Sequence, residues 1–191
     1  LSHIMIRLMK CNKEERIDFV IVPKGGNPLL AQYIASELGA NLIIAKDIND
    51  SARPQESDEI ERIGRIKYEG LDILLDKRHM GKLKGVLVDC NTSGGTQLVT
   101  IASDFNDLIN KCNLSIENIC NCYVLFKLIK IDLKSGKEVD TDKRFADINC
   151  KLHRLFDLDE EDKKGLCSIS YIDYYEAYSS GVLHELRSKI M

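Results

Sequence analysis

Two segments of the chain share one pattern: a short apolar run, a glycine turn and an amphipathic helix. The first runs from Asp18 to Gly39 as DFVIV, PKGGN and PLLAQYIASELG. The second runs from Gly85 to Lys111 as GVLVD, CNTSGGT and QLVTIASDFNDLINK. Neither apolar run alternates with polar residues, so both are expected to be buried on two faces, as inner strands of a parallel sheet. The pattern therefore predicts an α/β fold.

The remaining elements extend this sheet. Further strands are predicted at residues 41–46 (NLIIAK), 71–76 (LDILLD) and 119–132, with a hairpin turn at 134–137 and a terminal helix near 171–190. The charged stretch 47–68 is expected to be a mobile excursion or a solvated helix, and mobility is expected over the whole of 47–82. We predict a doubly wound, mainly parallel sheet with a C-terminal α+β appendage. It forms one domain over 6–191, with a core at 18–132 and the appendage at 140–191. Residues 1–5 resemble a cloning remnant and are left out of the predicted fold.

Composition excludes several classes of protein. The 191 residues are 44% hydrophobic and 30% charged, which is typical of a globular chain with a packed core. A net charge of −3 provides no general attraction to nucleic acid or to an anionic membrane. The chain has no apolar run long enough to span a membrane and no signal-peptide pattern, so a cytoplasmic protein is expected.

The seven cysteines are odd in number and include no C-x-x-C pair, which favours reduced thiols. Cys120 and Cys122 stand in the apolar run ICNCYVLFKLI, where an extended strand turns both side chains to one face. We interpret them as small core residues, because no histidine or third cysteine stands at ligand spacing. No protein-held metal site is predicted.

The two glycine turns are the candidate site, because ligands of open parallel sheets bind at the carboxyl ends of the strands. The second turn would form a cradle for a phosphate. It combines free backbone amides at a helix start, glycines that allow close approach, and hydroxyl groups. Asp89, at the end of the strand, would reach neutral hydroxyls beside that phosphate. A phosphate next to a diol describes a ribose 5-phosphate.

The segment VLVDCNTSGGT resembles the ribose-phosphate loop of the type I phosphoribosyltransferases, in which two acidic residues follow an apolar strand and precede a Thr/Ser-Gly-Gly-Thr turn. Thr92 to Thr96 match the phosphate half of that pattern, and Asp89 matches the second acidic residue. The resemblance implies that Asp89 is the catalytic residue. It also implies a phosphate site made by Cys90, Asn91, Thr92, Ser93, Gly94, Gly95 and Thr96.

The segment DFVIVPKGGNPLLAQYIASELG is similar to the pyrophosphate loop of the same family and the helix that follows it. Lys24, Gly25 and Gly26 would present an ammonium group and backbone amides to pyrophosphate. The resemblance further implies Mg²⁺, bound together with phosphoribosyl pyrophosphate, and a mobile charged loop that closes over the reaction.

Two features depart from the family pattern. Val88 occupies the position of the first acidic residue, so one of the two carboxylates expected to hold the ribose hydroxyls is absent. If the chain is a transferase, Val88→Asp is expected to raise activity or to be tolerated, provided that position 88 does not face the core. Few residues precede the first strand, so the base-recognising hood would come from residues 146–191, from a longer parent chain or from neither.

Three functions remain open at this point. One is a phosphoribosyltransferase, a glycosyltransferase that transfers phosphoribose to a base and releases pyrophosphate. Another is a catalytically inactive regulatory or assembly module that binds a nucleotide on the same fold, and the third is an unrelated doubly wound nucleotide-binding protein. The expected partner is a small nucleotide or sugar phosphate rather than nucleic acid or membrane. A homodimer or a larger parent assembly stays open.

Overall fold

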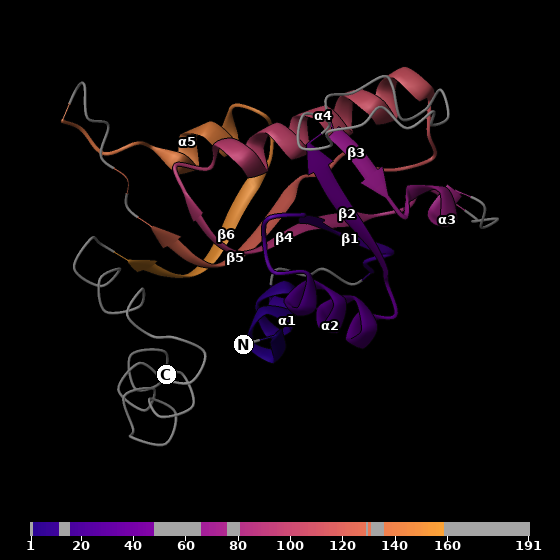
Figure 1. Cartoon of the computed structure of the whole chain (residues 1–191), viewed down its shortest axis with the longest axis horizontal. Coiled ribbons are helices and arrows are strands. Elements are labelled where there is room, and N and C mark those ends of the chain that lie inside the picture. The colour runs from indigo at the N-terminus through magenta and orange to yellow at the C-terminus, as the bar shows by residue number, and fades with distance from the viewer. Residues whose placement is uncertain are drawn as a thin grey trace. The chain divides into compact units, whose positions relative to one another are not determined.

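A six-stranded sheet in the order β3-β2-β1-β4-β5-β6 is the framework of the computed structural model (Figure 1). The structure describes residues 2–11, 16–47, 66–75, 81–128, 130 and 136–158. The strands are β1 (Phe19–Pro23), β2 (Asn41–Asp47), β3 (Ile66–Glu69), β4 (Gly85–Ser93), β5 (Asn121–Leu128) and β6 (Lys151–Leu158). The helices are α1 (Ser2–Cys11), α2 (Pro28–Leu38), α3 (Leu71–Leu75), α4 (Thr96–Cys112) and α5 (Thr141–Ala146).

Strand β1 lies at the centre of the parallel part of the sheet. It pairs with β2 and β4, and β4 pairs in turn with β5, all in parallel. Every residue of β1 is buried. The prediction that the two apolar runs are inner strands is therefore confirmed.

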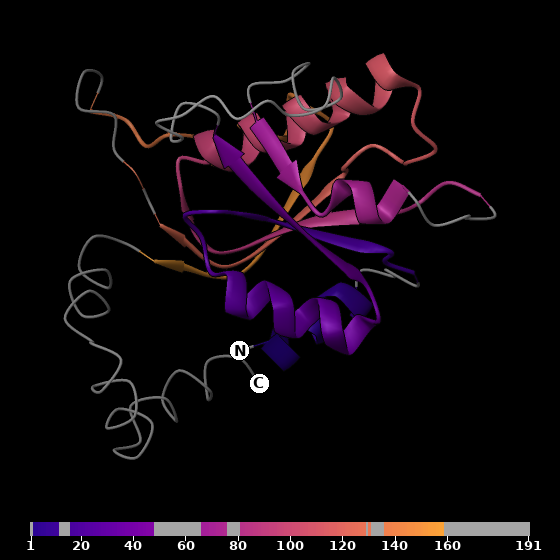
Figure 2. The same cartoon turned by 45° about the vertical axis from the view of Figure 1, so that its right-hand side comes forward.

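Helices cover both faces of the sheet, as Figure 2 shows. Alternate side chains of the inner strands enter two separate cores, since successive residues of a strand point to opposite faces. One core contains Phe19, Leu87 and the buried side of α4. The other contains Val20, Val88 and residues of α1 and α2. The predicted doubly wound α/β architecture is confirmed.

The turn between β1 and α2 follows directly from its sequence. Asn27 caps the helix by accepting a hydrogen bond at Oδ1 from the Leu30 amide, at 3.0 Å. Pro28 occupies the first helical turn, where its missing N–H costs nothing. Gly39 ends the helix in the left-handed conformation, at φ 64°. These local signals position the carboxyl end of β1 beside the start of α2.

The region after β2 differs from the prediction. Ile66–Glu69 form β3, which pairs antiparallel with β2, and the predicted strand at 71–76 is the helix α3. Gly70 turns the chain between them at φ 90°, where a Cβ would lie 2.7 Å from the Leu42 carbonyl oxygen. Leu71 and Leu74 then pack on the core at helical spacing. Residues 48–65 of the predicted mobile excursion lie outside the described residues.

Residues 2–5 form the first part of α1, although the prediction left residues 1–5 out of the fold. Met5 and Met9 are buried on the face of the sheet that α1 and α2 cover. His3 contacts Tyr33 of α2, with 3.1 Å between Nε2 and the hydroxyl oxygen. The sequence resembled a remnant because a ten-residue helix carries few signals before its packing partner is known.

Strand β6 extends the sheet beyond the predicted core of 18–132, and helix α5 precedes it in the chain. The chain divides into two compact units, Leu1–Asp157 and Leu158–Met191. Most of the second unit lies outside the described residues, including the predicted terminal helix, so the domain limits and the hood stay predictions. Within the described parts, no helix is long and apolar enough to cross a membrane.

Candidate functional site

The carboxyl end of β1 brings the first glycine turn against Asp89, in the middle of the neighbouring strand β4. A Cβ on Gly26 would lie 2.5 Å from Asp89 Oδ1 and 3.2 Å from the Pro23 carbonyl oxygen. A side chain at position 26 would force the Asp89 carboxylate or the turn to shift, so the packing favours glycine there. A Cβ on Gly25 would meet nothing within 4 Å. The two predicted site segments therefore lie next to each other.

The Asp89 carboxylate is held by the protein itself. Asp89 is 7% exposed, and its Oδ1 accepts a hydrogen bond from the Cys90 amide at 2.7 Å. The Asn27 amide also donates to this carboxylate. Burial raises the pKa of Asp89, and the hydrogen bonds from the two backbone amides lower it. A ribose diol would therefore meet a carboxylate that is largely buried and already accepts two backbone hydrogen bonds.

The predicted loop from Cys90 to Thr96 is mostly strand. Cys90–Ser93 belong to β4, and Asn91, Thr92 and Ser93 pair with residues 126–128 of β5. The ladder continues because β5 is long enough to offer backbone partners there, and paired amides are more stable than free ones. Only Gly94 and Gly95 remain as a turn before α4. The amides of residues 90–93 are therefore less available to an anion than the sequence predicted.

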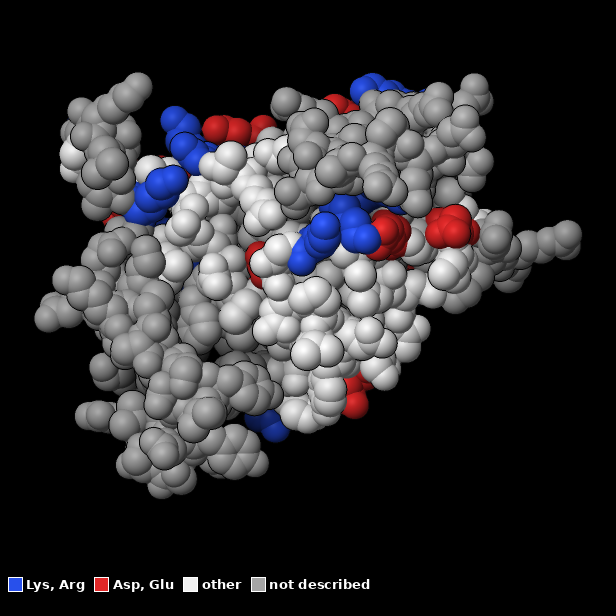
Figure 3. Space-filling view, viewed as in Figure 1, with Lys and Arg blue, Asp and Glu red and all other residues white. Residues whose placement is uncertain are grey.

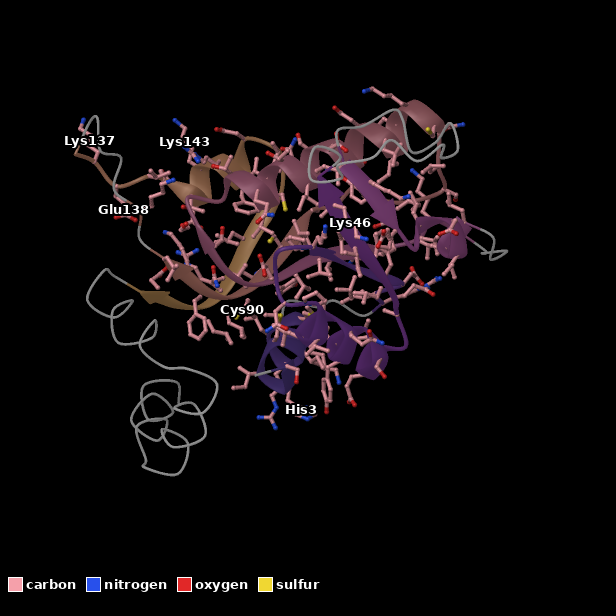
Figure 4. The ribbon with its side chains drawn as sticks, viewed as in Figure 1. His3, Lys46, Cys90, Lys137, Glu138 and Lys143 are labelled. Carbon is pink, nitrogen blue, oxygen red and sulfur yellow. The ribbon has the colours of Figure 1, made fainter. Side chains whose placement is uncertain are left out.

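Val88 lies in the core rather than at the site. It is fully buried on the sheet face that α1 and α2 cover. Cys90, on the same face, packs partly against that core and lies below the sheet in Figure 4. The resemblance assigns an acidic residue to position 88, but here β4 continues past that position under two helices. The fold therefore selects an apolar side chain at this point.

Helix α5 packs directly on the Gly94–Gly95 turn. Both glycines have φ 72°, and a Cβ on Gly95 would lie 2.9 Å from atoms of Phe145 and of Thr141. Arg144 Nη1 donates to the Gly94 carbonyl oxygen at 2.8 Å and to Thr96 Oγ1 at 2.9 Å. The guanidinium group thus lies at the first residue of α4, where a helix attracts anions.

Sequence reasoning missed Arg144. It stands 50 residues beyond Gly94 in the chain, in a segment with weak periodicity. One local signal was available: Asp140 caps α5 by accepting a hydrogen bond from the Lys143 amide at 2.9 Å. That signal predicts a helix start but not what the helix contacts.

The turn at Lys24–Gly26 uses two of its three amides within the protein. The Lys24 amide donates to the Ala45 carbonyl oxygen at 2.8 Å, and the Gly26 amide donates to that of Pro23 at 2.9 Å. The Lys24 side chain is exposed. The predicted pyrophosphate contacts are thus reduced to the Lys24 ammonium and the Gly25 amide.

Charges of both signs surround this edge of the sheet. Lys46 of β2 forms an ion pair with Glu69 of β3. Figure 3 shows Lys and Arg side chains in small groups on this face, partly beside acidic ones, with largely uncharged surface between them.

The residues at this site do not fit a magnesium ion held by the protein. No group of three or more His, Cys, Asp or Glu side chains in the described parts of the chain could hold a metal. Asp89 already accepts hydrogen bonds from two amides. A divalent ion prefers several oxygen ligands, which these side chains do not supply.

The chain combines a doubly wound α/β sheet with two glycine turns that follow neighbouring parallel strands. No protein-family model matches the chain, and no curated protein matches its sequence. Among solved structures, the adenine phosphoribosyltransferase of Rhodothermus marinus is similar with a TM-score of 0.51 and 16% identity, over 82% of this chain and 78% of that one. The orotate phosphoribosyltransferase of Aeropyrum pernix has a TM-score of 0.49 and 16% identity, over 86% and 75%. The chain therefore has a type I phosphoribosyltransferase-like fold. At such identities the similarity describes the fold and not the reaction.

Gly26→Ala is expected to lower the free energy of unfolding by about 1–3 kcal/mol, because the new methyl group collides with Asp89 and with the backbone at Pro23. Urea unfolding followed by circular dichroism measures the loss. Gly25→Ala is the matched control and should change stability by about 0.5 kcal/mol or less. Equal losses in the two variants would show that the turn does not contact Asp89 as described.

Proposed function

We propose that the chain is a binding module for a ribose 5-phosphate group, carried by a nucleoside monophosphate or by phosphoribosyl pyrophosphate, and that it does not transfer that group. The observation that carries the proposal is the position of Arg144, whose guanidinium group meets the Gly94 carbonyl and the Thr96 hydroxyl at the start of α4. This arrangement places a permanent positive charge at a helix N-terminus.

The phosphate would bind between α4 and α5. The first amides of α4 have no partner within the helix, and a helix start favours negative charge. Arg144 uses Nη1 for both of these hydrogen bonds, and within the described parts of the chain its Nε and Nη2 make none. Those N–H groups and the Thr96 hydroxyl would hold the phosphate oxygens.

The state of Asp89 supports binding without transfer. Transfer of phosphoribose develops positive charge on the sugar, and a nearby carboxylate would stabilise it. Here the carboxylate is buried against Gly26 and bonded to two backbone amides. Position 88 supplies no second carboxylate, since it holds a valine whose side chain lies in the core. Mg²⁺ would arrive with phosphoribosyl pyrophosphate, held by the ligand's own oxygens.

A transferase is the second candidate, favoured by one observation. The Lys24–Gly26 turn lies against Asp89, so a pyrophosphate and a ribose could bind side by side at this edge. The reaction would need the Gly26–Asn27 turn to release Asp89 when the ligand binds. The products would be pyrophosphate and a nucleoside monophosphate.

Isothermal titration calorimetry with phosphoribosyl pyrophosphate and with AMP, GMP and UMP, each with and without Mg²⁺, tests the binding. We expect the wild-type chain to bind at least one of them and Arg144→Gln to bind about 10–100-fold more weakly, the value of a charge-assisted hydrogen bond. Lys143→Gln is the matched control, because it removes the same charge from the neighbouring residue. In Figure 4 Lys143 points outward from α5.

A pyrophosphate-release assay with common purine and pyrimidine bases separates the two candidates. The binding module releases none. Pyrophosphate release by the wild-type chain that falls by two or more orders of magnitude in Asp89→Asn would establish the transferase instead. Absence of binding to every ligand would refute both.

A further inference from the structure

Two cysteines stand opposite each other where β5 and β6 begin. Cys120 directly precedes β5, and Cys150 directly precedes β6. The Lys151 amide donates to the Cys120 carbonyl oxygen at 2.8 Å. Three residues further along β5, the Tyr123 ring stacks on His153 with 4.5 Å between the ring centroids. Both contacts fit a parallel register in which each residue of β5 lies opposite the residue 30 positions later in β6. This register sets Cys120 opposite Cys150.

This pairing brings the two side chains within disulfide range. Neighbouring strands lie about 4.8 Å apart, and disulfides join residues whose Cα atoms are about 4.4–6.8 Å apart. Opposite residues of a parallel pair also point to the same face. Burial raises the pKa of Cys150 to about 12, and the Cys120 thiol acts in the same direction.

The two thiols differ in access to solvent. Cys120 is exposed, so its predicted place in the core is wrong, because it precedes β5 rather than lying within it. Its sulfur lies 3.3 Å from the Asn118 carbonyl oxygen. Cys150 is 3% exposed and packs in the core with α4. An oxidant in solution would therefore meet Cys120 first, and Cys150 would be protected until Cys120 has reacted.

Cys122 is a weaker partner for either thiol. It is fully buried within β5, and the same register sets Leu152 of β6 opposite it. Cys120 and Cys122 stand two residues apart on one extended stretch, about 6.6 Å between Cα atoms, which is at the upper end of the disulfide range, whereas the cross-strand spacing of about 4.8 Å lies well within it. The geometry favours the cross-strand pair.

We propose that Cys120 and Cys150 are a redox pair that forms a disulfide by exchange with a low-molecular-weight disulfide of the glutathione type. The Cys120 thiolate attacks one sulfur of that disulfide, forming a mixed disulfide and releasing one thiolate. Cys150 then loses its proton to water, and its sulfur attacks Cys120 and releases the second thiolate. The two protein thiols are oxidised by two electrons, and the small disulfide is reduced to two thiols.

The cross-link would fasten β6 to β5 at the amino ends of the strands. The ligand turn at Gly94 follows the carboxyl end of β4, at the opposite edge of the sheet. Oxidation is therefore expected to stabilise the fold without closing the proposed ligand site. Closing a loop between residues 120 and 150 restricts the unfolded chain, which raises the melting temperature.

The experiment uses the reduced full chain, incubated with oxidised glutathione, then alkylated with iodoacetamide and digested with trypsin. Mass spectrometry should find peptide 112–127 joined to peptide 145–151 through one disulfide. The link should be lost in Cys120→Ser and in Cys150→Ala, and kept in Cys112→Ser and Cys122→Ser. Thermal melts before oxidation confirm that each variant is folded.

Two results would overturn the proposal. One is glutathione on Cys120 with no link to Cys150 after prolonged incubation of folded wild-type chain. The other is a link to peptide 145–151 that survives in Cys120→Ser and disappears in Cys122→Ser. A melting temperature that rises on oxidation of the wild-type chain and not of Cys120→Ser would support the proposal independently of the peptide analysis.

Discussion

Val88→Asp is expected to unfold most of the protein at neutral pH rather than to restore a ribose-binding carboxylate. Val88 is fully buried on the sheet face covered by α1 and α2, among apolar side chains such as Val20 and Leu125. A carboxylate there would lose its hydration among mainly apolar neighbours, and burying a charge without an opposite one costs several kcal/mol. That is a large part of the 5–15 kcal/mol that typically stabilises a domain.

The pH dependence identifies the cause. Burial raises the pKa of an introduced carboxyl above its unfolded value of about 3.9, so the folded protein must protonate it or bury its charge. The loss of stability should therefore grow as the pH rises from 4.5 to 7.5, which urea unfolding at the two pH values measures. Asn91→Asp adds a carboxylate at an exposed position of the same strand and should change little. A melting temperature for Val88→Asp equal to that of the wild type at pH 7.5 would contradict the burial of this position.

Gly85→Ala is expected to destabilise the protein by about 3 kcal/mol. A Cβ at position 85 would lie 2.0 Å from Phe19 Cε2 and 2.1 Å from its Cζ. The ring has nowhere to move, because it is fully buried and packs on Phe105 with 5.7 Å between the ring centroids. The start of β4 or the core beneath it would have to shift.

A double-mutant cycle checks the origin of this effect. Phe19→Leu alone leaves a small cavity and should destabilise the protein, but in the Gly85→Ala background it should recover part of the lost stability. Urea unfolding of the four proteins gives the coupling energy. Additive losses would mean that alanine at position 85 acts through something other than the Phe19 ring.

Much of the fold could be predicted from local sequence. The unit from β1 through α2 to β2 was predicted because apolar runs, a proline at the first helical turn and a left-handed glycine act within a few residues of each other. The approach of the Lys24–Gly26 turn to Asp89 also follows from sequence, since parallel strands end at one edge. The helix α3 was missed because its five residues carry an apolar run that suits strand and helix alike.

The candidate site depended on partners that lie far away in the chain. Strand β4 continues to Ser93 because β5 pairs with it to Leu128, and this removes most of the predicted loop. Arg144 reaches Gly94 and Thr96 only because the chain between β5 and β6 crosses over the start of α4.

The sequence by itself determined the inner strands β1 and β4, the helices α2 and α4 that follow them, and the caps of α2. Only the tertiary structure decided that Val88 faces a core, that Asp89 is occupied by backbone amides and that a cation from α5 stands at the start of α4. The reason is physical. Turns and caps are stabilised by atoms a few residues apart, whereas burial and charge pairing depend on groups that only the folded chain brings together.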